Sequence, residues 1–183
     1  MFNALIRAVY RVAHWGLRLL WFIRRPETTG ALVAVWHRGR VLLVKNSYRA
    51  QLTLPGGYIR PREDRRTAAA RELREEVGIN VQPKRLVHAY HGTHVFEHRQ
   101  DTLDIYELDM ETEPKVQVDN REVVRAEFLT PDEALSMQVV PHLDEYLSKR
   151  IARARGVGLL INAPIYARLN MQDDGSGACC LNG

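Results

Sequence analysis

The sequence predicts an α+β fold in which a mixed sheet lies between layers of helices (an α/β/α arrangement). Short apolar strand patterns dominate the middle of the chain, one helix follows a glycine-rich loop there, and further helices come only late. The length of 183 residues suits one domain with extensions. We expect a basic amphipathic helix over residues 1–27, a globular domain over residues 28–152, and a partly disordered tail over residues 153–183.

Composition and charge narrow the class of protein. A hydrophobic fraction of 45% and a charged fraction of 26% are ordinary for a soluble domain and exclude global disorder. The two cysteines, Cys179 and Cys180, are adjacent and cannot cross-link a core, so we expect a cytoplasmic protein. The net charge is +4, but five arginines and no acid in residues 1–26 leave the remainder at −1. The basic excess is therefore local, and we expect no specific nucleic-acid partner.

The first element is a helix over residues 1–25, about 37 Å long. At 100° per residue its arginines gather on one side, and its apolar residues occupy the other. Three interpretations follow. The helix packs on the domain or on a second subunit, giving a homodimer; it is a transit-like segment; or it lies on an anionic membrane surface, on the cytoplasmic face.

Strand patterns follow the helix. Residues 31–36 and 41–45 form a hairpin around a short turn, and residues 52–54 form a strand that stops at Pro55-Gly56-Gly57. Residues 65–77 predict a helix, because their apolar members fall on one face and Gly78 stands where a helix cap belongs. The remaining predicted elements are strands over 85–90, 102–110 and 123–128, a helix opening at Thr130, and a helix over 143–154.

Three glutamates on the predicted helix 65–77 carry the chemistry. Glu72, Glu75 and Glu76 stand at i, i+3 and i+4 and therefore share one side of the helix. Two such charges about 5 Å apart repel by roughly 3 kcal/mol at an effective dielectric of 20. Nearby arginines can neutralise them as surface salt bridges, and a hard divalent cation such as Mg²⁺ or Mn²⁺ does so better.

The surrounding sequence resembles the Nudix box, G-x5-E-x7-R-E-U-x-E-E-x-G-U with U an aliphatic residue. Every defined position matches over 23 residues. The matching residues, in order, are Gly57, Glu63, Arg71, Glu72, Leu73, Glu75, Glu76, Gly78 and Ile79. The strand order on both sides extends the resemblance to about residues 28–150.

The resemblance implies a Nudix-type pyrophosphohydrolase that cleaves a nucleoside diphosphate linked to another group X. By motif position, the metal ligands would be Gly56 through its carbonyl, Glu72, Glu75 and Glu76. Arg71 would brace the loop by pairing with a carboxylate, and Glu63 would orient it. Metal ions promote attack by water on a pyrophosphate, and a carboxylate takes the proton. The motif leaves Glu72 and Glu76 as equal candidates for that base.

Outside the box, Glu122 is the candidate for an additional metal ligand, because it precedes a strand with an acidic and an aromatic residue, as some Nudix enzymes have. Its alternative is a surface glutamate at a strand end, and Glu97 is the weaker rival. Tyr48, Tyr58 and Phe96 are candidates for stacking on a base or for packing. The histidines lack zinc spacing and indicate loop and strand surface: His88, His91, His94 and His98.

The sequence does not identify the substrate. The marks of ADP-ribose, NADH and coenzyme A enzymes are absent. We expect a nucleotide-type small molecule. The alternative function is a non-catalytic nucleotide sensor or protein-binding module, which includes one associated with a membrane surface, although a binding module has no need of three clustered carboxylates. An isomerase of the same superfamily would need a cysteine in the domain, and both cysteines lie in the tail.

Overall fold

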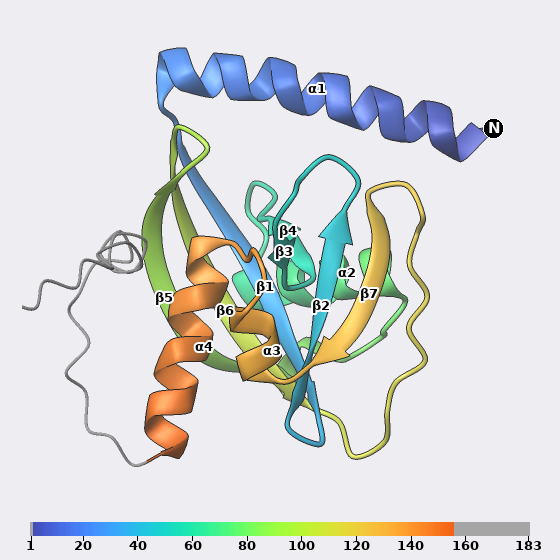
Figure 1. The fold of residues 1–183 in the computed structure, drawn as a ribbon, viewed down its shortest axis with the longest axis vertical. Coiled ribbons are helices and arrows are strands. Elements are labelled where there is room, and N and C mark those ends of the chain that lie inside the picture. The colour runs from blue at the N-terminus through green and yellow to red at the C-terminus, as the bar shows by residue number, and fades with distance from the viewer. Residues whose placement is uncertain (1, 156–183) are drawn as a thin grey trace, which may run out of the picture.

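The computed structural model describes residues 2–155, and it is an α+β structure with a mixed sheet between helices (Figure 1). The helices are α1 (Phe2–Arg24), α2 (Arg65–Val77), the 3₁₀ helix η1 (Pro83–Arg85), α3 (Pro131–Leu135) and α4 (Pro141–Ala154). The strands are β1 (Glu27–His37), β2 (Arg40–Asn46), β3 (Leu52–Thr53), β4 (Gly56–Tyr58), β5 (Val87–Phe96), β6 (Arg99–Asp109) and β7 (Val123–Leu129). Cys179 and Cys180 lie outside the described residues.

The sheet follows the order β3-β2-β1-β6-β5, with β4 paired to β1 and β7 paired to β2. The pairing of β1 with β6 is parallel, and the other pairs are antiparallel. The strands β1 and β2 pair only beside their turn, at Trp36↔Val41 and His37↔Arg40. Beyond that point β1 pairs with β4, whereas β2 pairs with β3 and β7, so β1 and β2 are no longer paired with each other.

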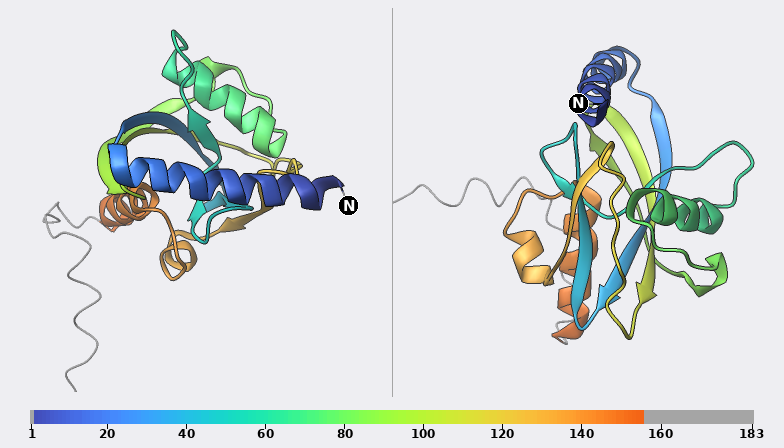
Figure 2. Two further views of the ribbon diagram at one scale, coloured as in Figure 1. Left: turned by 90° about the horizontal axis from the view of Figure 1, so that it is seen from above. Right: turned by 90° about the vertical axis from the view of Figure 1, so that its right-hand side faces the viewer.

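Helices cover both faces of the sheet (Figure 2). Helix α2 packs its buried Ala69, Leu73 and Val77 against one face, together with Val33 and Val35 of β1. Helices α3 and α4 pack on the other face, where Leu143 and Leu147 are fully buried. The apolar residues of the central strands therefore alternate between two cores.

Local signals set the ends of α2. The Asp64 side chain accepts a hydrogen bond from the Thr67 amide, 3.0 Å away, and caps the helix start. Gly78 ends the helix with φ of 74°, donating its amide hydrogen to the Arg74 carbonyl. The bounds predicted from the apolar face and from Gly78, residues 65–77, are confirmed.

The structure differs from the predicted elements between residues 56 and 110. Gly56–Tyr58 forms the short strand β4 where we expected only a loop. The strand predicted over 85–90 instead runs from Val87 to Phe96, and the strand predicted over 102–110 already begins at Arg99. These added segments pair with each other as a hairpin, through backbone hydrogen bonds. Their residues are largely polar and show no apolar alternation, so the sequence pattern did not predict them.

Helix α1 lies across one end of the sheet (Figures 1 and 2). Its side chains His14 and Trp21 are buried against the domain, whereas Val12 and Ile23 are more than 70% exposed. The helix therefore packs with its polar side inward and presents its apolar side outward. Of the helices within residues 2–155, none has both the length and the apolar character needed to span a bilayer.

Candidate active site

The paired glycines after β3 lie against the central strand. Gly56 and Gly57 of β4 stand opposite Leu32 and Ala31 of β1. Gly56 has φ of 147°, and a Cβ atom there would lie 2.4 Å from the Ala31 carbonyl oxygen. Only glycine fits this contact, which brings the backbone of β4 next to α2.

Two box glutamates on α2 point at these glycines. Glu76 is 7% exposed, and its Oε2 accepts a hydrogen bond from the Gly56 amide at 2.8 Å. The Glu72 carboxyl carbon lies 2.8 Å from the position that a Cβ of Gly57 would occupy. The missing side chain of Gly57 therefore provides the room that the Glu72 carboxylate occupies.

Arg71 braces the loop before α2. Its Nε and Nη2 donate to the two carboxylate oxygens of Glu63 at 2.8 and 2.9 Å, a bidentate pair. Its Nη1 donates to Glu72 at 2.5 Å, and its Nη2 also reaches the Tyr58 carbonyl at 3.2 Å. The hydrogen bonds from Arg71 lower the pKa of Glu63 to about 2. Arg71 thus joins the loop, β4 and α2.

Glu122 joins the group from the far side. It stands just before β7, and its Oε1 accepts a hydrogen bond from the Tyr48 hydroxyl at 2.7 Å. Burial raises the pKa of Glu72 and raises that of Glu76 well above the usual range. The charge of Glu122 adds to both increases, so the three carboxylates repel one another within a poorly hydrated space.

The donor set of this group fits a hard divalent cation. Three carboxylates, two of them with raised pKa, lie close enough to repel one another, and a cation bound among them would relieve both burial and repulsion. Within residues 2–155, no three His, Cys, Asp or Glu side chains are already drawn together as a metal-binding group. Their oxygens instead contact Gly56, Arg71 and Tyr48.

The other two acidic candidates lie apart from this group. Glu75 is at the rim, where its side chain is 43% exposed, and its oxygens lie 3.4 to 3.7 Å from the guanidinium groups of Arg71, Arg60 and Arg74. Glu97 faces α1 and bonds to His14 at 3.1 Å. Glu122 rather than Glu97 therefore lies beside the box glutamates.

A cavity of about 100 Å³ opens beside the glycines. Gly56, Gly57 and Glu122 line its end nearest the glutamates. The three aromatic candidates for base stacking, Tyr48, Tyr58 and Phe96, are also among its lining residues.

Two arginines in this cavity did not emerge from the sequence. Arg99 is 3% exposed and donates to Asp101 at 3.0 Å, yet within the described chain its Nε and Nη1 have no hydrogen-bond partner. Arg49 donates to Glu97 at 3.2 Å, and its Nε also has no hydrogen-bond partner there. These buried donors are available to a bound acceptor. An arginine at a strand start and another in a loop read as surface residues, so no signal marked them.

Helix α1 supports the walls of the same cavity. The Trp21 ring lies 4.2 Å from the Arg99 guanidinium carbon, within cation–π range. The His14 ring lies 4.8 Å from the Tyr48 ring, and His14 bonds to Glu97, which in turn holds Arg49. Helix α1, which lies outside the box, thus contacts Arg99 and Tyr48 directly and Arg49 through Glu97, and all three residues line the cavity.

The predicted surface histidines contact other groups. His88 and His91 bond to Asp104 at 2.9 and 3.0 Å, and His94 bonds to Glu145 at 2.6 Å. The His98 ring lies 5.2 Å from that of Phe22 on α1. None of these four histidines lines the cavity beside the glycines.

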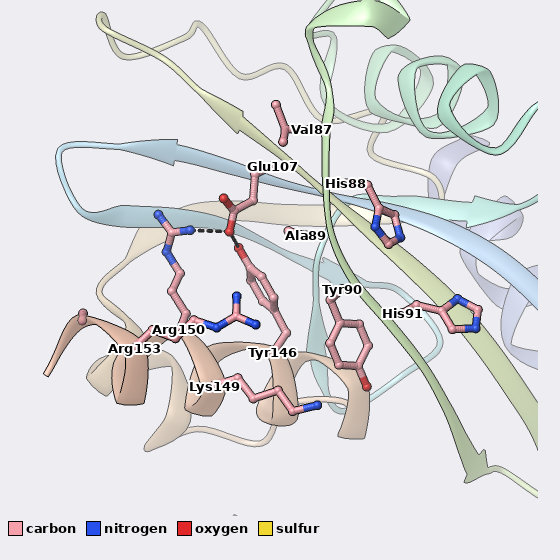
Figure 3. Close-up of a pocket in the computed structure, with 11 residues that line it drawn as sticks. Val87, His88, Ala89, Tyr90, His91, Glu107, Tyr146, Lys149, Arg150 and Arg153 are labelled. Atoms are coloured by element: carbon pink, nitrogen blue, oxygen red, sulfur yellow. Dashed lines mark hydrogen bonds and ion pairs between the residues drawn. The ribbon is translucent and has the colours of Figure 1, made fainter. Parts of the chain in front are cut away.

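A second, larger cavity of about 720 Å³ lies between β5 and α4 (Figure 3). Tyr146 and Arg150 of α4 meet Glu107 there, and Lys149 and Tyr90 lie alongside. No box residue lines this cavity. We therefore place the candidate active site at the smaller cavity, which Gly57 of the box lines together with Gly56 and Glu122.

Comparisons with known proteins agree with the geometry. The NUDIX domain family matches residues 25–149. A MutT NUDIX hydrolase from Burkholderia pseudomallei superposes with a TM-score of 0.59 at 22% identity, covering 67% of this chain and 96% of that one. A MutT protein from Methanosarcina mazei Go1 gives 0.61 at 19% identity, covering 72% and 96% respectively. An Ap4A hydrolase from C. elegans gives 0.57 at 20% identity, covering 71% and 98%. No curated protein sequence matches the chain.

Proposed function

The chain belongs to the NUDIX domain family, and from this premise we propose that it is a metal-dependent hydrolase that cleaves a pyrophosphate linkage in a nucleoside diphosphate derivative. One observation carries the proposal. Glu72 and Glu76 pack against the Gly56–Gly57 backbone, and these glycines line a cavity together with Glu122, aromatic residues and arginines. Carboxylates and a polyanionic substrate repel each other, and a divalent cation bound between them removes this repulsion.

The proposed cofactor is Mg²⁺, with Mn²⁺ as the alternative. Glu72, Glu76 and Glu122 would hold it, with the Gly56 carbonyl and Glu75 as further proposed ligands. The ion supplies positive charge beside the pyrophosphate and favours deprotonation of the attacking water.

The protein's own groups position the substrate and move the proton. We assign the general base to Glu72, because its side chain is 18% exposed, whereas Glu76 is 7% exposed and accepts a hydrogen bond from the Gly56 amide. Its raised pKa brings its proton affinity closer to neutral pH, which suits a base. Arg71 keeps the Glu72 carboxylate in place while it remains bonded to Glu63.

The cavity supports a nucleotide-type substrate. Tyr48, Tyr58 and Phe96 offer rings for stacking on a base, and Arg49 and Arg99 offer unpaired donors among the described residues. The carboxylates of Glu97 and Asp101 balance the two guanidinium charges. This balance favours a neutral acceptor such as a base edge over a further phosphate at that end. The proposed place of action is the cytoplasm, at the cytoplasmic face of a membrane.

A substrate panel tests the function. Purified protein is incubated with nucleoside triphosphates, ADP-ribose, sugar nucleotides and Ap4A, in Mg²⁺, in Mn²⁺ and in EDTA. We expect product release from at least one class, with metal only. Glu75→Gln and Glu76→Gln should each lower turnover by about 10²-fold or more, because an amide keeps the shape but loses the charge. Glu111→Gln is the control, because Glu111 is exposed and lies outside both the box and the cavity lining.

The same panel separates the runner-up function, a non-catalytic nucleotide sensor. Calorimetric binding of a nucleotide without product release, under every metal condition, would favour the sensor. Full activity in EDTA, or in both glutamine variants, would contradict the proposed site.

A further inference from the structure

The arginine side of α1 is occupied by the domain. Arg7 and Arg11 donate through Nε to the carbonyl oxygens of Asn120 and Ser47, both at 3.1 Å. His14 and Trp21, on the same side of the helix, are buried. The charged side that the sequence alone would offer to an anionic surface therefore makes internal contacts.

The opposite side of α1 is apolar and uncovered. Five aliphatic side chains on it are 60% to 73% exposed: Leu5, Val9, Val12, Leu19 and Ile23. At 100° per residue these five positions fall within an arc of about 80°. The half of the helix centred on them carries no charged residue, and its length of 23 residues makes it about 34 Å long.

We infer that this outward apolar side of α1 lies on a lipid surface, embedded at the level of the headgroups. The helix is the outermost element at its end of the molecule, so a flat surface can reach its whole length (Figures 1 and 2). Exposed Trp15 and Phe22 stand at one border of the apolar side, where aromatic rings favour the interface.

Charge favours lipid over a second copy of the chain. Residues 1–26 contain five arginines and no acidic residue, so a second copy of this helix offers no acidic partner to an arginine beside the apolar side, whereas anionic headgroups do. Arg24 stands at one border of the apolar side, where it can contact anionic headgroups while the aliphatic side chains enter the acyl region.

The inference also sets the place of the active site. The inner side of α1 contacts Tyr48 and Arg99, which line the substrate cavity, while the outer side would contact lipid. The cavity would then open within about one helix diameter, roughly 10 Å, of the headgroups. This inference does not rest on the proposed hydrolysis, because binding to lipid needs no turnover.

Vesicle co-sedimentation of the full chain tests the inference. Vesicles of phosphatidylcholine alone are compared with vesicles that also contain phosphatidylglycerol, at low and high salt. Val12→Glu combined with Leu19→Glu places two charges on the outward side. Val87→Glu combined with Val95→Glu is the matched control, because these exposed β5 valines receive the same charges. Circular dichroism and thermal unfolding confirm that both variants fold.

We expect the unaltered chain and the control to bind anionic vesicles. The α1 variant should bind them at least about ten-fold more weakly. High salt should weaken binding without abolishing it, because apolar insertion is not screened. Binding that salt abolishes, or that the α1 variant retains, would overturn the inference. So would a lipid-independent dimer that the α1 variant converts to monomer in analytical ultracentrifugation, which would assign the apolar side to a second copy.

Discussion

Gly56 and Gly57 are adjacent and identical, yet they are needed for different reasons. A Cβ at Gly56 would collide with backbone atoms of β1, at 2.4 Å from Ala31 O and 2.6 Å from Leu32 Cα, and its φ is positive. A Cβ at Gly57 would meet only the end of the Glu72 side chain. The fold therefore requires a glycine at position 56. The glycine at position 57 provides the room that the Glu72 carboxylate occupies.

This contrast predicts different outcomes for two alanine variants. Gly57→Ala should fold with little loss of stability and should lower turnover about ten-fold or more, because the methyl group displaces the Glu72 carboxylate. Gly56→Ala should lose about 1–3 kcal/mol or more of unfolding free energy, from strain and overlap with β1. Thermal unfolding and initial rates measure both. If Gly57→Ala kept its activity, the room that Gly57 leaves for the Glu72 carboxylate would have no part in turnover.

At the scale of residues, spacing predicted the box side chains but not their partners. The match of Glu63 and Arg71 to the motif implied a pair, and the structure has that pair. Arg99 could not be predicted, because its environment comes from α1, β4 and its neighbour Asp101. Periodicity reports on neighbours along one element, whereas this environment assembles only in the folded chain.

Helix α1 shows the same limit at the scale of elements. Its period correctly predicted a helix with two unlike sides. A period does not say which side faces the domain, and here hydrogen bonds and aromatic contacts draw the polar side inward. By contrast, α2 was predicted to the residue, because its apolar face and its C-terminal cap Gly78 are local signals.

Two tryptophans on α1 offer a matched pair for testing its inner side. Trp21 is 8% exposed beneath Arg99, whereas Trp15 is 68% exposed. In lipid-free assays, Trp21→Ala should raise KM about ten-fold with little change in kcat, because Arg99 loses its support. Trp21→Phe should restore much of the affinity, and Trp15→Ala should leave both constants unchanged. Equal effects of the two alanine variants would show that α1 does not support the cavity.

A pH dependence belongs to the contact of α4 with β5. Burial raises the pKa of Glu145, but hydrogen bonds from Lys149, Tyr90 and His94 outweigh it and lower the pKa to about 2. The ionised carboxylate therefore stabilises the fold above about pH 4.5, and this stabilisation is lost as the pH falls from 4.5 towards 2. The melting temperature of Glu145→Gln should fall less between about pH 5 and pH 3 than that of the unaltered chain. Parallel acid profiles would contradict the assignment, with Glu111→Gln as the control.

For the whole molecule, the carboxylates of the site link stability to metal and pH. Burial raises the pKa of Glu76, so ionising it costs folding free energy as the pH rises above the unfolded value of about 4.5. A cation favours the ionised form and removes that cost. Mg²⁺ or Mn²⁺ should therefore raise the melting temperature more at about pH 8 than at about pH 6. Glu76→Gln should lose most of this difference, and a metal effect independent of pH would contradict the link.

The short passage from α1 into β1 has a mechanical consequence. Only Arg25 and Pro26 separate the helix from the strand, so the join spans at most about 7 Å and cannot absorb a pull. Strand β1 is central, pairs with β6 in parallel from Glu27 to Trp36, and holds the glycines of β4. A force applied to the N-terminus would load many β1–β6 hydrogen bonds in shear at once. In single-molecule pulling from the N-terminus, we expect β1 to resist a high force before it separates from β6. The strand that bears this load is also the one that pairs with the glycines of the candidate active site.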